Sequence, residues 1–160
     1  MKKILKWTLI FLGVAFIGIQ VVRPAKTNPP VDETRTIISR AQVPAEVSAI
    51  FERSCNDCHT HKTRWPWYSE IAPVSWYLVH DVNHGREHLN LSDWAAYDTR
   101  RALRKLDEIC EEIEKGAMPP SVYLLLHPSA KLSDADKKAL CEWANAERER
   151  INQTQVSEAQ

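Results

Sequence analysis

The chain has 160 residues, with 21 lysines and arginines balanced by 21 aspartates and glutamates, so its formal net charge is zero. This length favours a single domain, and the ordinary share of hydrophobic residues (44%) argues against wholesale disorder. The neutral balance removes the electrostatic case for a nucleic-acid-binding protein. The charge is uneven, however. Residues 1–26 hold five basic residues and no acid, which leaves residues 27–160 with 16 basic and 21 acidic residues.

The N-terminal segment, residues 1–26, is predicted to be an export signal or a membrane anchor. Lys2, Lys3 and Lys6 precede sixteen uncharged residues, Trp7–Val22. A cleavable signal has an apolar core of about 7–15 residues and a small-residue cleavage site, and neither fits well. Residues 4–22 just reach the length of a membrane-spanning helix if Lys6 extends to the interface. We therefore expect an anchor rather than a cleaved signal, with the rest of the chain on the periplasmic side of the cytoplasmic membrane of a bacterium.

Three further regions follow from composition: a Pro-rich tether over 27–43, a folded domain over 44–151 and a flexible tail over 152–160. The closely spaced prolines of the tether favour an extended chain. The tail has almost nothing apolar to bury.

The folded domain is predicted to be all-α. We expect helices over residues 44–59, 74–84, 93–115 and 134–151, from their apolar spacing. Gly85 is expected to end the second helix and Gly116 the third. Ser92 offers an N-cap for the third helix, and Ser133 with Asp136 resembles a capping box for the last.

The chemistry of the chain is expected at Cys55-Asn-Asp-Cys58-His59. This C-x-x-C-H pattern is typical of covalent attachment of c-type haem. One helical turn separates the two cysteines, so both sulfurs can reach the vinyl groups of one porphyrin, and His59 can then bind the iron as proximal ligand. The alternatives are a redox dithiol, a zinc pair completed by His59 and His61, or a structural disulfide. Neither a βαβ context nor finger-like ligand spacing supports the first two.

Met118 is the predicted distal iron ligand. It is the only methionine besides the initiator, and it lies in Gly116-Ala-Met-Pro-Pro120, after the third helix. Pro119 keeps Met118 out of the helical region and stiffens the loop, as an axial thioether requires. The rival ligands are four histidines, for which a structural role is the simpler interpretation: His80, His84, His88 and His127. The first three follow helical spacing, but Gly85 is expected to interrupt the series.

The sequence resembles mono-haem cytochrome c and, more closely, a family of bacterial cytochrome c-like haem-binding domains. The resemblance covers about residues 45–146. It rests on the C-x-x-C-H motif, on residues 65–76 and 85–94, on the Met-Pro loop and on Tyr123-x-x-x-His-Pro128. It implies one covalently bound haem c, and by analogy a crossing contact between Phe51 and Trp143. Leu91 departs from the aromatic residue expected there, a conservative change.

Axial ligation by His59 and Met118 suits an electron carrier rather than an enzyme, because both iron positions are filled. The acidic domain predicts redox partner proteins with basic patches. The alternative is a haem-based sensor or haem-handling protein with a labile distal ligand. A peroxidase would need an open distal site with acid–base groups, for which His80 or His84 are the candidates.

Other residues have both structural and functional interpretations. The aromatic residues of the Pro-rich stretch could bond a haem propionate or cover the edge of the core: Trp65, Trp67, Tyr68 and Trp76. Arg64 and Arg86 could pair with propionates or be solvated. Cys110 and Cys141 could form a disulfide or remain thiols. Apolar spacing predicts these core residues in the last two helices: Leu103, Leu106, Cys110, Ile113, Leu140, Trp143 and Ala144.

Overall fold

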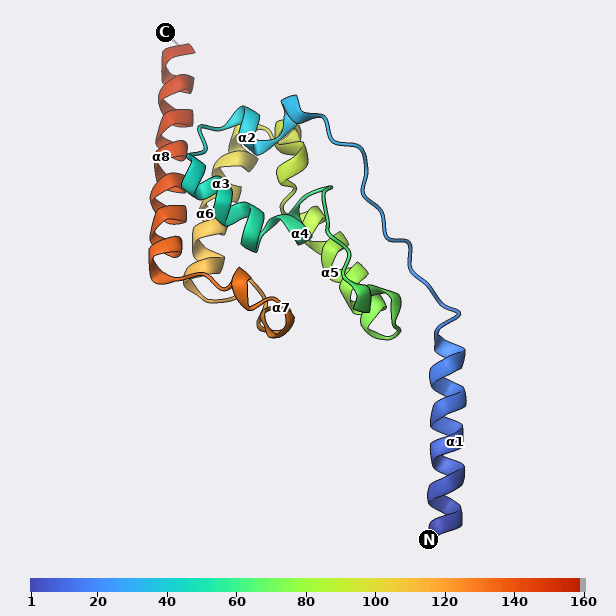
Figure 1. Ribbon diagram of the computed structural model, residues 1–160. Coiled ribbons are helices and arrows are strands. Elements are labelled where there is room, and N and C mark those ends of the chain that lie inside the picture. The colour runs from blue at the N-terminus through green and yellow to red at the C-terminus, as the bar shows by residue number, and fades with distance from the viewer. Residues whose placement is uncertain (159–160) are drawn as a thin grey trace.

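The structure is a computed structural model that describes residues 1–158, and every regular element in that range is a helix (Figure 1). The α-helices are α1 (Lys2–Ile19), α2 (Ile37–Arg40), α3 (Ala45–Ser54), α4 (Asn56–His59), α5 (Val74–His88), α6 (Thr99–Glu114), α7 (Ser121–Leu126) and α8 (Asp134–Glu158). Short 3-10 helices lie between them: η1 (Glu33–Arg35), η2 (Trp67–Glu70), η3 (Leu91–Ala96) and η4 (Pro128–Ala130). The predicted all-α class is confirmed.

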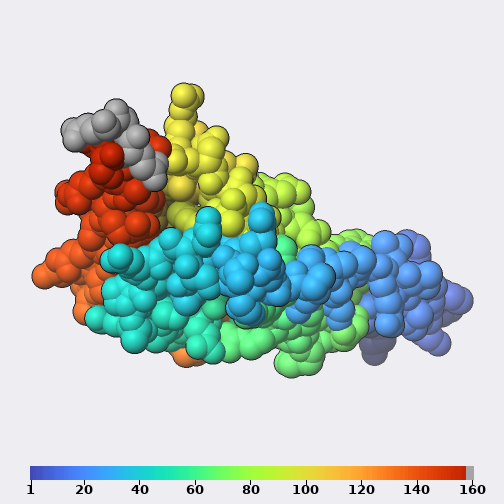
Figure 2. All heavy atoms as spheres, turned by 90° about the horizontal axis from the view of Figure 1, so that it is seen from above, coloured from blue at the N-terminus to red at the C-terminus, as the bar shows by residue number. Residues whose placement is uncertain are grey.

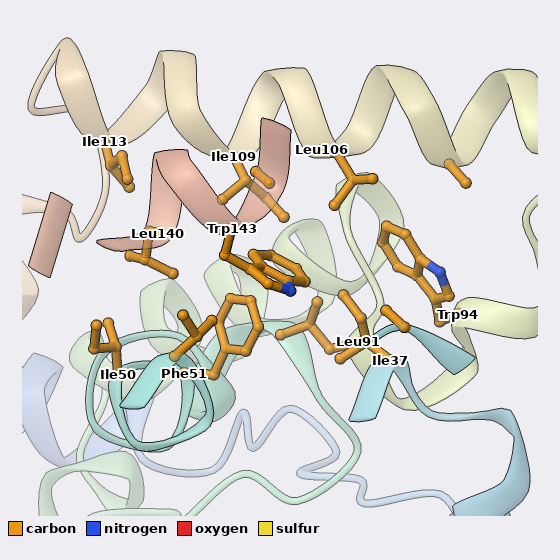
Figure 3. Close-up of a cluster of buried hydrophobic side chains, with 14 of the residues drawn as sticks. Ile37, Ile50, Phe51, Leu91, Trp94, Leu106, Ile109, Ile113, Leu140 and Trp143 are labelled. Carbon is orange, nitrogen blue, oxygen red and sulfur yellow. The ribbon is translucent and has the colours of Figure 1, made fainter. Parts of the chain in front are cut away.

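Helices α6 and α8 run side by side, and α3 crosses α8. Apolar side chains from these helices, with others from α2 and η3, form the core shown in Figure 3, where Leu106 and Leu140 are fully buried. At the crossing, Phe51 packs edge-on against Trp143, with ring centroids 5.3 Å apart. The indole Nε1–H of Trp143 donates to the Gln42 carbonyl at 3.0 Å, so its one polar atom is also paired. The contact expected between Phe51 and Trp143 is confirmed.

A disulfide between Cys110 and Cys141 joins α6 to α8. This settles the choice between a disulfide and free thiols that the sequence leaves open. The buried face of α6 is rotated slightly from the predicted stripe. Leu106 and Ile113 are buried as expected. Leu103, which was predicted to be buried, is half-buried, whereas Ile109, which was not predicted, is buried.

The predicted start of the third helix, at residue 93, is wrong. Residues 91–96 form η3, with a non-helical backbone at Asp93, and α6 begins only at Thr99. Asp98 is the true N-cap, since its carboxylate accepts a hydrogen bond from the Arg101 N–H at 2.7 Å. The predicted cap, Ser92, instead accepts from the His61 backbone N–H at 2.9 Å.

Two helix ends behave as predicted, and a third extends further. Gly116 follows α6 with φ +70°, the left-handed conformation that glycine adopts readily. Ser133 and Asp136 make the expected capping box. The Ser133 backbone N–H donates to the Asp136 carboxylate at 2.8 Å, and the Asp136 backbone N–H donates to the Ser133 hydroxyl oxygen at 3.1 Å. Helix α8 continues past the predicted end at Ile151 to Glu158, and residues 159–160 of the predicted tail lie outside the described range.

Helix α1 projects away from the domain, and its side chains from Lys2 to Gly18 are exposed (Figure 1). Within residues 1–158, no helix combines the length and apolarity needed to cross a membrane. Whether residues 4–22 are a membrane anchor or a signal therefore stays a prediction.

The segment that follows α1, from residue 20 onward, lies along the domain (Figure 2). The Gln20 carboxamide exchanges two hydrogen bonds with the Ala72 backbone, at 2.9 and 3.1 Å. The Trp76 indole N–H donates to the Val22 carbonyl at 2.7 Å. These bonds fix the segment 20–28, here called the strap, against η2 and α5.

Candidate functional site

The C-x-x-C-H motif forms a separate one-turn helix rather than the end of a longer one. Cys55 breaks the helix between α3 and α4, with φ −123° and ψ −38°. Its carbonyl then accepts hydrogen bonds from the N–H groups of Cys58 at 3.2 Å and His59 at 3.0 Å. Both thiols and the imidazole therefore lie on one turn of chain, and all three side chains are half-buried. Neither Cys55 nor Cys58 is in a disulfide.

The imidazole of His59 is held by two backbone carbonyls. Its Nδ1 lies 3.0 Å from the carbonyl oxygens of Gly85 and Leu89. Carbonyl oxygens accept hydrogen bonds, so Nδ1 carries the proton and Nε2 presents its lone pair. Burial also lowers the pKa of His59, which keeps the ring neutral. A neutral imidazole oriented by a backbone carbonyl through its other nitrogen is the usual form of a metal-ligating histidine.

Gly85 makes this arrangement possible by letting α5 approach α4 closely. A Cβ at residue 85 would lie 2.8 Å from the Cys58 carbonyl oxygen, inside any normal contact. Helix α5 runs through Gly85 to His88, so the prediction that Gly85 ends the helix is wrong. Glycine is required here for close packing of two backbones rather than for a turn. The sequence signal is the same for both uses.

The two motif thiols are protonated in the folded chain. Burial, with the neighbouring Cys58, raises the pKa of Cys55 to about 12. Burial, then the charges of Asp57 and Asp81, raises the pKa of Cys58 to about 11. Redox-active dithiols instead need a thiolate, which positive surroundings stabilise. The electrostatics therefore disfavour the redox dithiol.

The positions of the possible metal ligands disfavour the zinc alternative. Within residues 1–158, one group of three possible ligand side chains lies close enough to share a metal ion. It consists of Cys110, Glu114 and Cys141. Its two sulfurs are in the disulfide. His61, the proposed partner of a zinc pair, instead has its Nε2 2.9 Å from the Asn90 amide nitrogen.

Helix α7 is tied to the motif by a polar network that sequence analysis missed. The Tyr123 hydroxyl donates to the Asp57 carboxylate at 3.0 Å, and Arg64 pairs with the same carboxylate at 3.1 Å. Burial, together with Asp57, raises the pKa of Tyr123. The Tyr123 ring also stacks on His127, with centroids 4.1 Å apart. The only sequence signal was the Tyr-x-x-x-His spacing, which places the two rings one helical turn apart.

Met118 lies on the loop between α6 and α7, one turn of chain before Tyr123. Its backbone N–H and that of Ala117 donate to the Glu112 carbonyl at 3.2 and 3.0 Å, so the loop is anchored to the end of α6. The Met118 side chain is 38% exposed. Within the described residues, the structure connects this loop to the motif through Tyr123 and Asp57, and not through Met118 itself.

The remaining candidates have structural contacts. Arg86 joins three segments, since it donates to the Thr60 and Thr27 carbonyls, both at 2.8 Å, and to the side chains of Asn28 and Thr63. Trp76 holds the strap. By contrast, large apolar side chains of η2, of the loop after α6 and of α7 stay exposed: Trp67, Met118, Val122, Leu125 and Leu126.

The site fits haem on the chain's own chemistry. It offers two neutral thiols on one turn, a neutral imidazole with Nε2 unshared, and apolar side chains that nothing in the described chain covers. A haem-binding domain model matches residues 14–146, most of the chain. The chain belongs to the haem-binding domain family. This result confirms haem as the cofactor; the covalent linkage and the ligands Cys55, Cys58, His59 and Met118 stay predictions.

The chain is also similar to part of a named enzyme. Cytochrome c peroxidase Ccp of Escherichia coli (strain K12) is 27% identical over 100 residues, which is 61% of this chain and 22% of that protein. The chain thus spans about a fifth of the relative's length. No solved structure matches the chain.

Proposed function

We propose that this haem-binding domain protein is a mono-haem c-type electron carrier. Cys55 and Cys58 would hold one haem through two thioether bonds. Each thiol would add across one vinyl group, with a carbon–sulfur bond formed and the thiol hydrogen passed to the other vinyl carbon, so the attachment would consume no oxidant. The observation that carries the proposal is His59, whose Nδ1 lies 3.0 Å from two carbonyl oxygens and whose Nε2 has no hydrogen-bond partner within residues 1–158.

His59 and Met118 would ligate the iron from opposite sides. The haem supplies one-electron chemistry, and methionine as one axial ligand raises its reduction potential. The chain's part is to keep both ligands in place. The Gly85 and Leu89 carbonyls orient His59, while the Glu112 carbonyl and the Tyr123–Asp57 bond anchor the segments on either side of Met118.

A Met118→Ala variant tests the electron-carrier proposal. We expect the oxidised wild-type protein to show the weak long-wavelength band of a methionine–iron bond. The variant should lose that band, have a lower reduction potential and bind carbon monoxide. Leu126→Ala, another exposed side chain nearby, is the matched control and should keep the band. An unchanged spectrum and potential in Met118→Ala would contradict the assignment of the distal ligand.

Peroxide reduction is the second candidate function, and the relative named as a peroxidase is the observation that favours it. A sensor would share its main requirement, an iron whose distal position opens. Carbon monoxide binding and peroxide turnover by the wild-type protein distinguish these functions from electron transfer. Carbon monoxide binding with peroxide turnover supports an enzyme, and binding alone supports a sensor. The absence of both supports the electron carrier.

We also propose that residues 4–22 hold the domain at the outer face of the cytoplasmic membrane. The exposed apolar side chains of α1 would be costly to leave in water, and three lysines flank its N-terminal end. The strap would then keep η2 and the start of α5 near the bilayer. Resistance of the protein to alkaline extraction from membranes tests this placement; release into the soluble fraction would contradict it.

Redox partners would be recognised through charge. The domain beyond residue 26 has an excess of five acidic residues. We therefore propose partner proteins with basic patches, whose association weakens as salt screens the attraction. An electron-transfer rate that is independent of ionic strength would contradict this.

A further inference from the structure

Three histidines form an exposed row along α5. His80, His84 and His88 are spaced by four residues, and because α5 is continuous through Gly85 they lie on one face. The His80 and His84 rings have centroids 5.8 Å apart, and those of His84 and His88 are 4.3 Å apart. The second pair is therefore the closer one.

The two ring nitrogens of this pair face each other. His84 Nε2 lies 3.1 Å from His88 Nε2. Imidazole nitrogens bind zinc at about 2.0–2.1 Å, so two of them on one ion are about 2.9 Å apart at a right angle and about 3.4 Å apart in a tetrahedron. The observed separation falls between these values. The pair can therefore close on a metal ion with very little movement.

A hydrogen bond between the rings is the simpler use of this contact. It would require one Nε2 to carry a proton, and between exposed groups its net contribution is small because water competes for both nitrogens. No residue in 1–158 hydrogen-bonds to Nδ1 of either ring, so the protein does not select that tautomer. With both protons on Nδ1, each Nε2 carries a lone pair, and the two atoms are 3.1 Å apart, a separation that a shared cation can bridge.

We propose that His84 and His88 bind one divalent first-row transition-metal ion through their Nε2 atoms. Imidazole suits copper, nickel and zinc, and the general order of affinities favours Cu²⁺. In residues 1–158 no carboxylate lies close enough to join the pair in a cluster of three, so water completes the coordination. This ion is separate from haem iron, which His59 would ligate from α4.

Titration of Cu²⁺ into the haem-loaded full-length protein tests the site. Calorimetry should give one ion per chain, and electron paramagnetic resonance should show two imidazole nitrogens on copper. His84→Asn and His88→Asn should each weaken binding about tenfold or more, because a two-ligand chelate becomes a single ligand. His80→Asn is the matched control, since it leaves the pair intact, and should bind as tightly as the wild type.

Equal affinity in the wild type, His84→Asn and His88→Asn would overturn the proposal. So would a loss of binding in His80→Asn, which would place the ion elsewhere on α5. The haem absorption spectrum of each variant is recorded in parallel. A change of haem ligation in His88→Asn would assign that side chain to the haem and would also overturn the metal pair.

Discussion

The two halves of the domain are stabilised in different ways. The disulfide half (α3, α6 and α8) closes on itself, with a buried core, the Phe51–Trp143 contact and the Cys110–Cys141 bond. The motif half (α4, α5 and α7) is held mainly by polar bonds around His59 and Asp57, and it leaves apolar side chains exposed. The first half is therefore complete as a protein core, and the exposed apolar side chains of the second support the proposal that haem completes it.

The largest expected effect is on the disulfide half. Replacing Cys110 and Cys141 by serine should lower the free energy of unfolding by about 3–4 kcal/mol, because the disulfide closes a loop across a sequence separation of 31 residues. Urea unfolding measures this. The haem spectrum of the folded variant should not change. A variant of normal stability, or one with altered haem ligation, would break the proposed division into halves.

Gly85→Ala should damage the motif half. The added Cβ would meet the Cys58 carbonyl oxygen at 2.8 Å, and the resulting shift should cost about 1–3 kcal/mol and misplace the carbonyl that orients His59. Urea unfolding and the fraction of haem-loaded protein are the measurements. Gly13→Ala is the control, because a Cβ there meets nothing within 4 Å. Normal haem loading in Gly85→Ala would show that the close approach of α4 and α5 is dispensable.

The motif thiols predict a pH dependence that haem should remove. Folding raises the pKa of Cys55 and Cys58 from 9.0 to about 12 and 11. Their contribution to stability is full below pH 9 and is lost as pH rises further, because the unfolded chain ionises first. By pH 10 the haem-free protein should lose about 1–2 kcal/mol relative to the Cys55→Ser, Cys58→Ser variant, allowing for partial exposure.

Unfolding free energies at pH 8 and pH 10 measure this difference. Under the proposed covalent attachment, haem-loaded protein has no free motif thiols and should follow the serine variant. Parallel losses in all three proteins would show that the thiols are not buried as described.

The smallest effect is expected at the strap. Gln20→Ala removes two hydrogen bonds to the Ala72 backbone and should cost about 1 kcal/mol or less, since the strap is partly solvated. Limited proteolysis should cut the segment 20–28 faster in the variant, with Gln155→Ala as a surface control. Equal cleavage rates would show that these bonds do not hold the strap.

The sequence predicted those features that depend on local chemistry. The one-turn spacing of Cys55 and Cys58, the Ser133 capping box and Gly116 at the end of α6 each follow from short-range rules. The buried positions of Leu140 and Trp143 follow from helical period, and the resemblance to cytochrome c gave the contact between Phe51 and Trp143. Haem as the cofactor was predicted from five residues.

The features that it missed depend on contacts between distant segments. The sequence suggested that Gly85 ends a helix. Its actual role is to allow close contact with the Cys58 backbone, and no local pattern reveals that contact. Arg86 was a candidate for propionate pairing, but it binds Thr27 and Thr60, from two other segments. Asp98 caps α6 where Ser92 was an equally good candidate from sequence. Met118 as distal ligand stays a prediction.

Intact-mass measurement of the denatured protein tests the central claim most directly. The chain is expressed with a cytochrome c maturation system, together with the Cys55→Ser, Cys58→Ser variant. We predict that the wild-type chain keeps the added mass of one haem after denaturation and that the variant has the mass of the polypeptide alone. A wild-type chain that releases its haem on denaturation would contradict covalent attachment at Cys55 and Cys58.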